Sequence, residues 1–541
     1  MFLSKEVKAK LRAGIFRHLD GIATGPSAMA LHEAGIIDKL VDQGEALLSD
    51  LTRDFKANEG YLNVALRVLA SQGWLTQEIL GHGEDVRFSI TDTGKIAATM
   101  LDQYAQPVAF IPHATHLGEY LREGFPSQAY HAMQRLFAHY NELNQDDVYA
   151  DALTTQVQKQ ILKHVEGLIV GPIIVALGIN GMFHQYFSIA PFEVEEFTPH
   201  HKEVREIIEF LTSIDWFTKN GNVYNFTTEG LFYARRATAY GVTVSYLPAF
   251  ARVRELLFGN PRIFWDRPAG STEIHVDRLM NVWGSGGAHT AYFKQIDQIV
   301  TELFNRPIHD QPKGFLDMGC GNGTLLEHIF DVIWKQTERG KMLEEYPLFI
   351  VGADFNEKAL LATRETLNRA GIWAKVVFGD VGKPELLAES LQEKYNIFLG
   401  DLLNVRSFLD HNRVYAPPQT IDEAWVSNSS GAFAFRGERI PNHIIEQNLV
   451  DHLRKWSPYV QRFGLLVMEL HTIDPTLTAA NLGKVAATAY DATHGYSDQY
   501  ILELDCFLKA AELAGLKPDP SFRKRYPDSE LATISLNLLR G

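Results

Sequence analysis

Short apolar runs alternate with helical stretches along the C-terminal half of the chain. They are GFLDMG, LFIVGADF, AKVVFGD, YNIFLGDLL and FGLLVMELH, and a further run, LATISLNLL, comes near the end. Strands that alternate with helices in this way are typical of a parallel sheet covered by helices on both faces. The last run follows a Pro-containing stretch, and a strand that arrives by a hairpin runs antiparallel. We therefore predict an α/β domain with a Rossmann-like sheet that is parallel except for one strand.

The N-terminal half has a mainly helical pattern that ends twice in a short strand pair. Three segments recur in the same order: GPSAMALHEAGIIDKL and GPIIVALGINGMFHQY, LRVLASQGWLT and IEFLTSIDWFT, FSITDTG and YNFTTEG. Helices followed by a β-hairpin are the layout of a winged helix, so the repeat predicts two winged-helix copies. The predicted domains are winged-helix unit 1 (1–100), a helical connector (101–164), winged-helix unit 2 with a linker (165–280) and the α/β domain (281–541).

Composition and charge narrow the class of protein. The chain has 541 residues, of which 46% are hydrophobic and 22% charged, as in a soluble globular protein of several domains. Its net charge of −15 argues against nucleic acid as a partner, because phosphate binding needs clustered Lys and Arg. The N-terminus lacks the apolar core of a signal peptide, and no run of about 18 apolar residues predicts a membrane span. With only Cys320 and Cys506, we expect a reducing, cytoplasmic location.

A glycine-rich turn is the strongest chemical signal. It lies directly after the run GFL and before the helical segment TLLEHIF, and consists of Asp317, Gly319, Gly321, Asn322 and Gly323 with two residues between them. Glycines allow a tight turn and a close approach of the backbone to a ligand. In open α/β sheets, ligands bind beyond the carboxyl ends of the strands, which is where this turn is expected.

A dinucleotide site is the main alternative for such a turn. The dinucleotide pattern G-x-G-x-x-G requires its third glycine at position 324, where the chain has Thr324. It also places an acidic residue about 20 positions further on, whereas the next acid at a strand end is Asp354. Both departures disfavour a dinucleotide.

The order D-x-G-x-G-x-G, with acids at the ends of the following strands, resembles class I S-adenosylmethionine (SAM)-dependent methyltransferases. The resemblance implies that Asp354 accepts the ribose hydroxyls of SAM, that the segment at Asp380 binds the adenine, and that Asp317 meets the amino-acid end. It also places the end of the fourth strand beside the sulfonium. The cofactor-binding residues implied in these later strand ends are Asp354, Phe355, Asp380, Val381, Asp401 and Leu402.

The segment VWGSGGAHTAYF precedes the α/β domain and has two interpretations. By analogy with the family, it covers the cofactor, with Tyr292 or His289 near the methionine group. Alternatively, its glycines form a hinge between domains.

Two long polar segments, 403–443 and 471–498, follow the fourth and fifth predicted strands and are expected to hold the methyl acceptor. They contain the motifs SFLDHNR, ELH and HGYSDQY. Together with WGSGGAH, these motifs resemble methyltransferases of polyketide assembly lines, in particular the metal-dependent methyltransferase domain of the apratoxin polyketide synthase loading module. The resemblance implies a small or acyl-carrier-protein-bound, malonyl-like substrate in polyketide or other secondary-metabolite biosynthesis.

Methylation of carbon beside a thioester needs an enolate, which a metal ion would stabilise. The ligand set predicted for one iron or manganese ion is His411, His471 and Gln499, with Asp410 and His494 as neighbouring proton-transfer groups. The alternative is metal-free O-methylation of a small hydroxylated metabolite, with His411 or His494 as the general base.

The duplicated winged helix carries few basic residues, which disfavours a reader of DNA. In small-molecule O-methyltransferases a winged helix serves as a lid and dimerisation element, so the resemblance implies a homodimer. A degenerate methyltransferase that acts as a binding or structural subunit is a further alternative. We expect an enzyme, because a degenerate copy would have lost part of the glycine turn, Asp354 or Asp380.

Overall fold

The structure is a computed structural model that describes residues 3–81, 83–145, 151–183, 190–268, 271 and 273–541. It divides into two units. Unit 1 comprises Met1–Gly287 with Ala434–Arg439 and Asp474–Ser497, and unit 2 comprises Ala288–Phe433, Ile440–Ile473 and Asp498–Gly541. Two short segments of the C-terminal half therefore pack with the N-terminal half.

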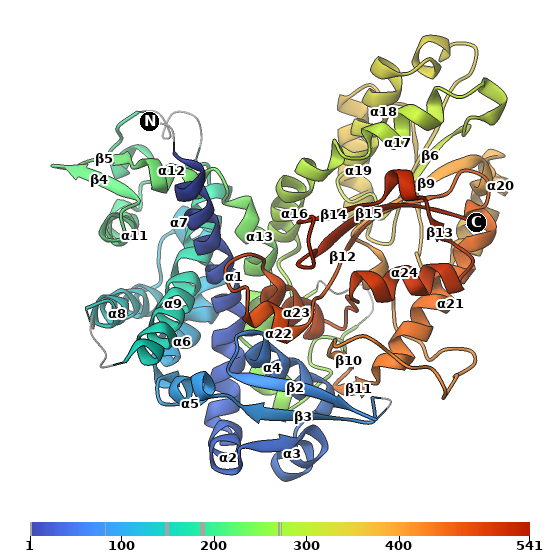
Figure 1. Cartoon of the computed structure of the whole chain (residues 1–541). Helices are drawn as coiled ribbons and strands as arrows, with labels where there is room; N and C mark the ends of the chain where they lie inside the picture. Colours follow the sequence, from blue (N-terminus) through green and yellow to red (C-terminus); the bar gives the residue numbers. More distant parts are fainter. Residues whose placement is uncertain (1–2, 82, 146–150, 184–189, 269–270, 272) are drawn as a thin grey trace. The chain divides into compact units, whose positions relative to one another are not determined.

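Unit 2 is built on one sheet with the strand order β13-β15-β12-β9-β6-β7-β8, and β14 also pairs with β15. Strands β12, β9, β6, β7 and β8 run parallel, whereas β15 is antiparallel to β12 and β13 (Figure 1). This confirms the predicted α/β fold with one antiparallel strand. The strand bounds are β6 (Gly314–Met318), β7 (Phe349–Asp354), β8 (Lys375–Phe378), β9 (Leu402–Ser407), β12 (Leu465–Leu470), β13 (Lys517–Pro518), β14 (Lys524–Tyr526) and β15 (Ile534–Arg540).

Helices cover both faces of this sheet, because successive strand residues point to opposite sides. Phe315 packs in a buried cluster with α17 (Asp297–Phe304), α18 (Thr324–Gln336) and α19 (Glu357–Arg369). Its neighbour Leu316 packs in a second cluster, with α20 (Pro384–Tyr395) and α21 (Asn442–Val460). Burial on both faces explains why the strands read as nearly continuous apolar runs.

The parallel register brings the carboxyl ends of the central strands to one edge of the sheet. Met318 of β6 pairs with Ala353 of β7 and with Arg406 of β9, and Ser407 pairs with Met468 of β12. The turns that leave β6, β7, β9 and β12 are therefore neighbours.

In the duplicated N-terminal half of the chain, the two copies pack against each other through two long helices of unit 1. These helices are α1 (Lys5–Glu33) and α9 (Ala152–Ile179). A Cβ atom on Gly21 would lie 2.2 Å from the His164 Cα atom, and one on Gly167 would lie 2.5 Å from the His18 Cα atom. Any larger residue at either glycine would force the helices apart. The repeated glycines are thus reciprocal contacts between the two copies.

Reciprocal hydrogen bonds accompany these contacts. The Tyr240 hydroxyl lies 2.7 Å from His18 Nδ1, and the Tyr104 hydroxyl lies 2.7 Å from His164 Nδ1. Each copy supplies the histidine for the tyrosine of the other copy. The two halves of unit 1 therefore pack with approximate two-fold symmetry, as expected for a duplication.

Each copy ends in a β-hairpin. The first consists of β2 (Leu75–Leu80) and β3 (Asp85–Ile90), with β1 (Glu45–Leu47) beside β3, and the second consists of β4 (Phe217–Asn220) and β5 (Val223–Phe226). The hairpins complete the predicted duplicated winged helix.

Helix α9 is, among the described residues, the one helix long and apolar enough to cross a membrane. However, 83% of its most apolar window is buried inside the protein. It is accordingly the core helix of unit 1.

Candidate active site

The glycine turn after β6 has the backbone geometry that only glycine adopts readily. Gly319, Gly321 and Gly323 have φ angles of +81°, +55° and +79°. A Cβ atom on Gly319 would lie 3.0 Å from the Leu409 side chain, and one on Gly323 would lie 3.1 Å from the Thr363 backbone. The turn therefore leaves its backbone open toward the carboxyl edge of the sheet.

Asp317 provides a buried carboxyl group beneath this turn. It is 2% exposed, and its Oδ1 atom has no hydrogen-bond partner among the described residues. Burial and, to a smaller extent, the charge of Asp354 raise the pKa of Asp317 to about 8. A cationic ligand would relieve this unfavourable burial, and SAM carries both an ammonium and a sulfonium. The residue thus fits the amino-acid end of SAM.

Asp354 ends β7 and is tied to the glycine turn. Its Oδ2 atom accepts the Gly321 N–H at 3.1 Å, and its Oδ1 atom accepts the Asn356 N–H at 2.8 Å. These bonds fix the carboxylate at the carboxyl end of β7, beside the glycine turn. Asn322 has a different role, since its side-chain oxygen accepts the Thr324 N–H and hydroxyl at the start of α18.

An aromatic pair lies at the ends of β7 and β8. The Phe355 ring is 69% exposed, and its centroid lies 5.4 Å from that of Phe378. Two exposed rings at a ligand-binding strand end would bury apolar surface against an adenine. Asp380 accepts the Gly382 N–H at 2.8 Å, and the Val381 carbonyl accepts Trp456 Nε1–H at 2.7 Å, which fixes the neighbouring loop.

The predicted placement of Asp401 and Leu402 at the end of the fourth strand is wrong. The strand β9 begins at Leu402, which pairs with Gly314, the first residue of β6. Asp401 lies at the opposite edge of the sheet, where it binds Lys313 Nζ at 2.7 Å. The apolar run IFLG forms a turn, and the true strand LLNVRS contains three polar residues that obscure its pattern.

Tyr292 lies near the end of α16 (Arg278–Phe293). Its ring centroid lies 6.4 Å from that of Phe408, which directly follows β9, and 5.3 Å from that of Tyr526. Burial raises the pKa of the Tyr292 hydroxyl, which stays neutral. Tyr292 therefore reaches the edge of the sheet that carries the SAM turn, whereas the side chain of His289 lies outside the described ones.

A buried histidine–carboxylate pair links the segment after β9 to the carboxyl end of β12. His411 Nδ1 lies 2.5 Å from Glu469 Oε1, and both side chains are more than nine-tenths buried. Glu469 also accepts the N–H groups of Leu470 and Asp410, each at 2.7 Å. With the Nδ1 proton directed at the carboxylate, the lone pair of His411 is on Nε2, where the exposed Asn412 amide donates at 3.1 Å. This is the geometry of an oriented general base.

Asp410 has a role other than the predicted proton transfer. Its fully buried carboxylate accepts hydrogen bonds from Arg406 and from His452 Nε2, the latter at 2.8 Å. Burial opposes its ionisation, but Arg406 and His452 hold the pKa of Asp410 below its usual value. The carboxylate is thus turned into the protein and fixes the loop that carries His411.

Glu469, Arg406 and His452 were missed as functional residues in the sequence. The signal that was present for Glu469 is a carboxylate at the end of the apolar run FGLLVMEL, because a buried charge needs a specific partner. No spacing rule links it to His411, 58 residues earlier.

One of the predicted metal ligands, His471, already has protein partners on both ring nitrogens. His471 is fully buried, its Nδ1–H donates to the Leu502 carbonyl at 3.0 Å, and its Nε2 accepts the Ser535 hydroxyl at 2.7 Å. Burial lowers the pKa of His471 to about 4, so the ring is neutral and both nitrogens are engaged. Gln499 lies in an irregular segment rather than at the start of a helix, since α24 spans Leu504–Leu513.

His494 lies on α23 (Ala487–Gly495), which belongs to unit 1. Its Nδ1 atom is 2.7 Å from the Tyr490 carbonyl, within the same helix. His411, in contrast, belongs to unit 2, in which it lies near the glycine turn.

Three family models match the chain. They describe the AprA MT2-like domain (residues 273–537), the AprA N-terminal domain (residues 11–77) and the AprA winged helix domain (residues 166–260). The winged-helix match covers the second predicted copy. No curated protein matches the sequence.

Similar solved structures include several methyltransferases. The mitomycin 7-O-methyltransferase MmcR is 11% identical, with 71% of this chain and 98% of that chain covered and a TM-score of 0.42. Human N-acetylserotonin methyltransferase in complex with SAM is 14% identical, with 73% and 99% covered and a TM-score of 0.42. The CurJ carbon methyltransferase is 10% identical, with 76% and 99% covered and a TM-score of 0.32.

Proposed function

Since the chain belongs to the AprA-like, SAM-dependent methyltransferases, we propose that it methylates the carbon beside the carbonyl of a malonyl-like acyl group. The acyl group is small or bound to a carrier protein, and the product enters polyketide or other secondary-metabolite biosynthesis. The observation that carries the proposal is the His411–Glu469 pair at the carboxyl edge of the sheet, with His411 in the segment after β9 and Glu469 at the end of β12. A base at this edge is what a carbon acid needs.

SAM, when bound, supplies an electrophilic methyl group. His411 Nε2 removes the proton from the acidic carbon of the acyl group, and the electron pair of that C–H bond forms the new C–C bond to the methyl carbon. The bond from that methyl carbon to the sulfonium sulfur breaks at the same time, its electron pair stays on sulfur, and S-adenosylhomocysteine is the leaving group. Glu469 stabilises the imidazolium that results, because its Oε1 atom lies 2.5 Å from Nδ1. The proton then passes from His411 to solvent. No metal step is part of the proposal, because both ring nitrogens of His471 already have protein partners.

Mass spectrometry of malonyl-carrier protein incubated with the full chain and SAM tests the proposal. The acyl group should gain a methyl group on carbon. His411→Gln should abolish the gain while SAM binding persists, and His309→Gln, at an exposed position of unit 2, should have no effect. Methylation of a small hydroxylated acceptor in place of the malonyl group would replace this proposal by the metal-free O-methyltransferase. Failure to bind SAM at all would favour a structural subunit.

A further inference from the structure

The two copies of unit 1 keep the same internal contacts. Copy 1 begins with α1 and copy 2 with α9, and the helix before the hairpin is α4 (Glu59–Ser71) in copy 1 and α11 (His201–Ser213) in copy 2. In copy 1, the Thr91 hydroxyl accepts the Gly94 N–H at 2.9 Å and donates to the Trp74 carbonyl at 3.1 Å. Copy 2 repeats both bonds, at 2.9 and 3.2 Å, with Thr227, Gly230 and Trp216. The copies therefore correspond residue by residue.

The contact between the copies has the form of a homodimer interface. In a two-fold dimer, residue i of one subunit meets residue j of the other, and j of the first meets i of the second. The His18–Tyr240 and His164–Tyr104 hydrogen bonds follow this rule, as do the glycine contacts of α1 and α9. Here both partners of each contact belong to one chain. Copy 2 thus occupies, beside copy 1, the position of a partner subunit.

Copy 1 holds a part of the C-terminal half, the segment Asp474–Ser497, which belongs to unit 1. Arg67 of α4 forms a buried ion pair with this segment, because its Nε atom lies 2.9 Å from Asp491 Oδ2. A Cβ atom on Gly495 would lie 2.7 Å from the side chain of Val64, which is also on α4. The missing side chain of this glycine therefore allows α23 to lie against α4.

Copy 2 has a different cover on the equivalent helix. The residue of α11 that corresponds to Val64 is Glu206. Its carboxylate accepts hydrogen bonds from the Tyr130 hydroxyl and, at 3.0 Å, from Gln134 Nε2. Both donors lie on α8 (Ser127–Leu143). Helix α8 thus contacts copy 2 at the position where α23 contacts copy 1.

Two further contacts hold α8 on copy 2. The Phe137 ring stacks on Phe210 of α11, with the ring centroids 4.4 Å apart. The Tyr140 hydroxyl donates to Glu166 of α9 at 2.7 Å. The helices of copy 2 that correspond to α1 and α4 are therefore both bound by α8.

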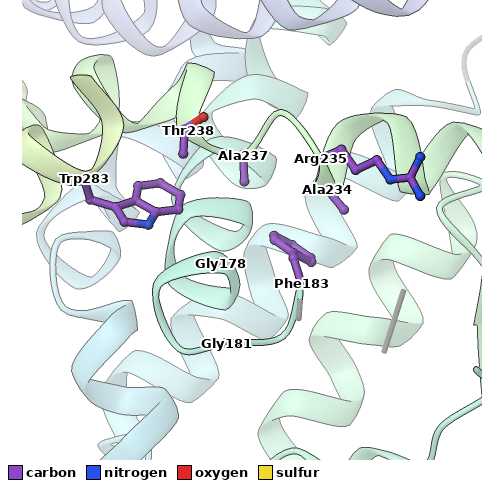
Figure 2. A pocket seen from close by; sticks show the side chains of 8 residues that line it. All are labelled: Gly178, Gly181, Phe183, Ala234, Arg235, Ala237, Thr238 and Trp283. Carbon is purple, nitrogen blue, oxygen red and sulfur yellow. The ribbon is translucent and has the colours of Figure 1, made fainter. Parts of the chain in front are cut away.

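The copies also differ at the end of α9, where a cavity of about 190 Å³ lies. Figure 2 shows the Trp283 ring of α16 near Gly178 and Thr238, which also line this cavity. In copy 1 the equivalent residues are His32 and Asp102, whose Nε2 and Oδ1 atoms lie 3.4 Å apart. A Cβ atom on Gly178 would lie 3.2 Å from the Trp283 ring, so a larger side chain would displace the ring. Copy 2 thus lacks two side chains that copy 1 has, and it holds α16 in their place.

We propose that unit 1 is an internal dimer and that the full chain works as a monomer. Copy 2 replaces a partner subunit, so the two-fold face of copy 1 is covered within the chain. The copies have different roles, since copy 1 binds the segment Asp474–Ser497, whereas copy 2 binds α16 and carries α8 as a substitute for a second such segment. The homodimer that the family resemblance implies is then already present inside one chain. The proposal concerns assembly and is independent of the acceptor chemistry.

Sedimentation equilibrium of the full chain tests the assembly. The mass of one chain should be found from nanomolar to micromolar concentrations, because the two-fold face has no second chain to bind. A mass of two chains at micromolar concentration would refute the internal dimer.

Exchange of equivalent residues between the copies tests their different roles, with amide hydrogen exchange as the measurement. Val64→Glu puts a charge against Gly495, so the segment Asp474–Ser497 should exchange about tenfold faster or more, and α8 should be unchanged. Glu206→Val removes the acceptor of two donors of α8, so α8 should exchange about tenfold faster and the segment should be unchanged.

Two further variants complete the experiment. Gly495→Ala, which brings a methyl group against Val64 from the other side, should repeat the pattern of Val64→Glu in a milder form. Arg135→Gln, at an exposed position of α8, is the matched control and should leave both covers unchanged. If Gly495→Ala or Glu206→Val accelerates exchange equally in α8 and in the segment, or in neither, the division of roles between the copies is refuted.

Discussion

Substitution of Glu469 by Gln isolates the chemical role of the buried pair. Glu469 is 2% exposed, and each of its two oxygens accepts a backbone N–H, from Leu470 on Oε1 and from Asp410 on Oε2. Because both oxygens of the carboxylate accept from N–H donors, an amide in its place puts an NH2 group against one of these backbone N–H groups or against the Nδ1 proton of His411. Glu469 touches His411 and not the substrate, so it is a positioning residue.

The expected loss follows from the charge that Glu469 neutralises. A hydrogen bond to a charged group contributes about 2–3 kcal/mol, and this stabilisation is realised only when His411 is protonated in the transition state, so kcat should fall by about 30- to 150-fold. If the amide also reverses the tautomer of His411, the loss approaches the ~10⁴-fold known for a misoriented histidine base. KM should change little, because the carboxylate does not face the acyl group.

Steady-state kinetics of Glu469→Gln, His411→Gln and the double variant provide the assay, with SAM affinity by calorimetry and folding by circular dichroism. Residues that act as one unit are not additive, so the double variant should be no slower than His411→Gln. A correctly folded Glu469→Gln protein with wild-type kcat would refute the reasoning, as would additive losses in the double variant.

Three other predictions concern the cofactor and metals. Asp354→Ala should weaken the binding of SAM by about 3 kcal/mol, because two hydrogen bonds to a charged acceptor are lost. Asp331→Ala, on the outer face of α18, should leave the affinity for SAM unchanged. If calorimetry gives both variants the same affinity for SAM, Asp354 is not part of the site. The affinity for SAM should rise with pH up to about 8 and then level off, because the pKa of Asp317 is about 8 and the carboxyl group must lose its proton to bind a cation. Asp317→Asn should abolish this pH dependence. A pH dependence that survives in the variant would show that Asp317 does not bind the cation. Chelator-treated, metal-free protein should keep full methyltransferase activity, and activity that is lost and then restored by iron or manganese would show that a metal acts at residues other than the engaged His471.

The sheet and the glycine turn could be predicted because their signals are local. A turn with positive φ angles requires glycine whatever the surrounding structure, and Asp354 stands at the end of an apolar run that forms a single strand. The duplication was visible for a similar reason. Gly21 and Gly167 stand at equivalent places in two copies of one pattern, and both are kept free of a side chain by the crossing of α1 and α9.

The fourth strand could not be predicted because its polar residues have tertiary partners. The Asn404 amide donates to the Leu399 and Leu402 carbonyls, and Arg406 binds Asp410 and stacks over Trp456 at 4.2 Å. These partners allow polar side chains to be buried within a strand. In the sequence alone, the same polar residues suggest that the strand has ended.

The metal ligand set stays a prediction, but the surroundings of His471 argue against its part in that set. His471 has the residue type of a ligand, and only the fold shows that the Leu502 carbonyl and the Ser535 hydroxyl already use its two nitrogens. A side chain's type gives what it can bind, whereas its neighbours decide what it does bind. The same irregular segment that ends at Leu502 also explains why Gln499 is not helical, because the Tyr500 N–H donates to the His411 carbonyl rather than within a helix.

The balance of buried charge supports the proposed role of His411 as the base. Around it, the guanidinium groups of Arg406 and Arg413 are matched by the carboxylates of Asp410 and Glu469, all buried. Burial lowers the pKa of His452 to about 4, so that ring adds no charge. When His411 takes a proton from the substrate, the imidazolium adds one positive charge to a set of groups whose charges otherwise balance. Glu469 is the carboxylate in contact with His411. Because Asp410 is already engaged by Arg406 and His452, it cannot share that task. The network thus holds the loop rigid through one carboxylate and leaves the other for the imidazolium, which is a transient charge that returns to solvent after each transfer.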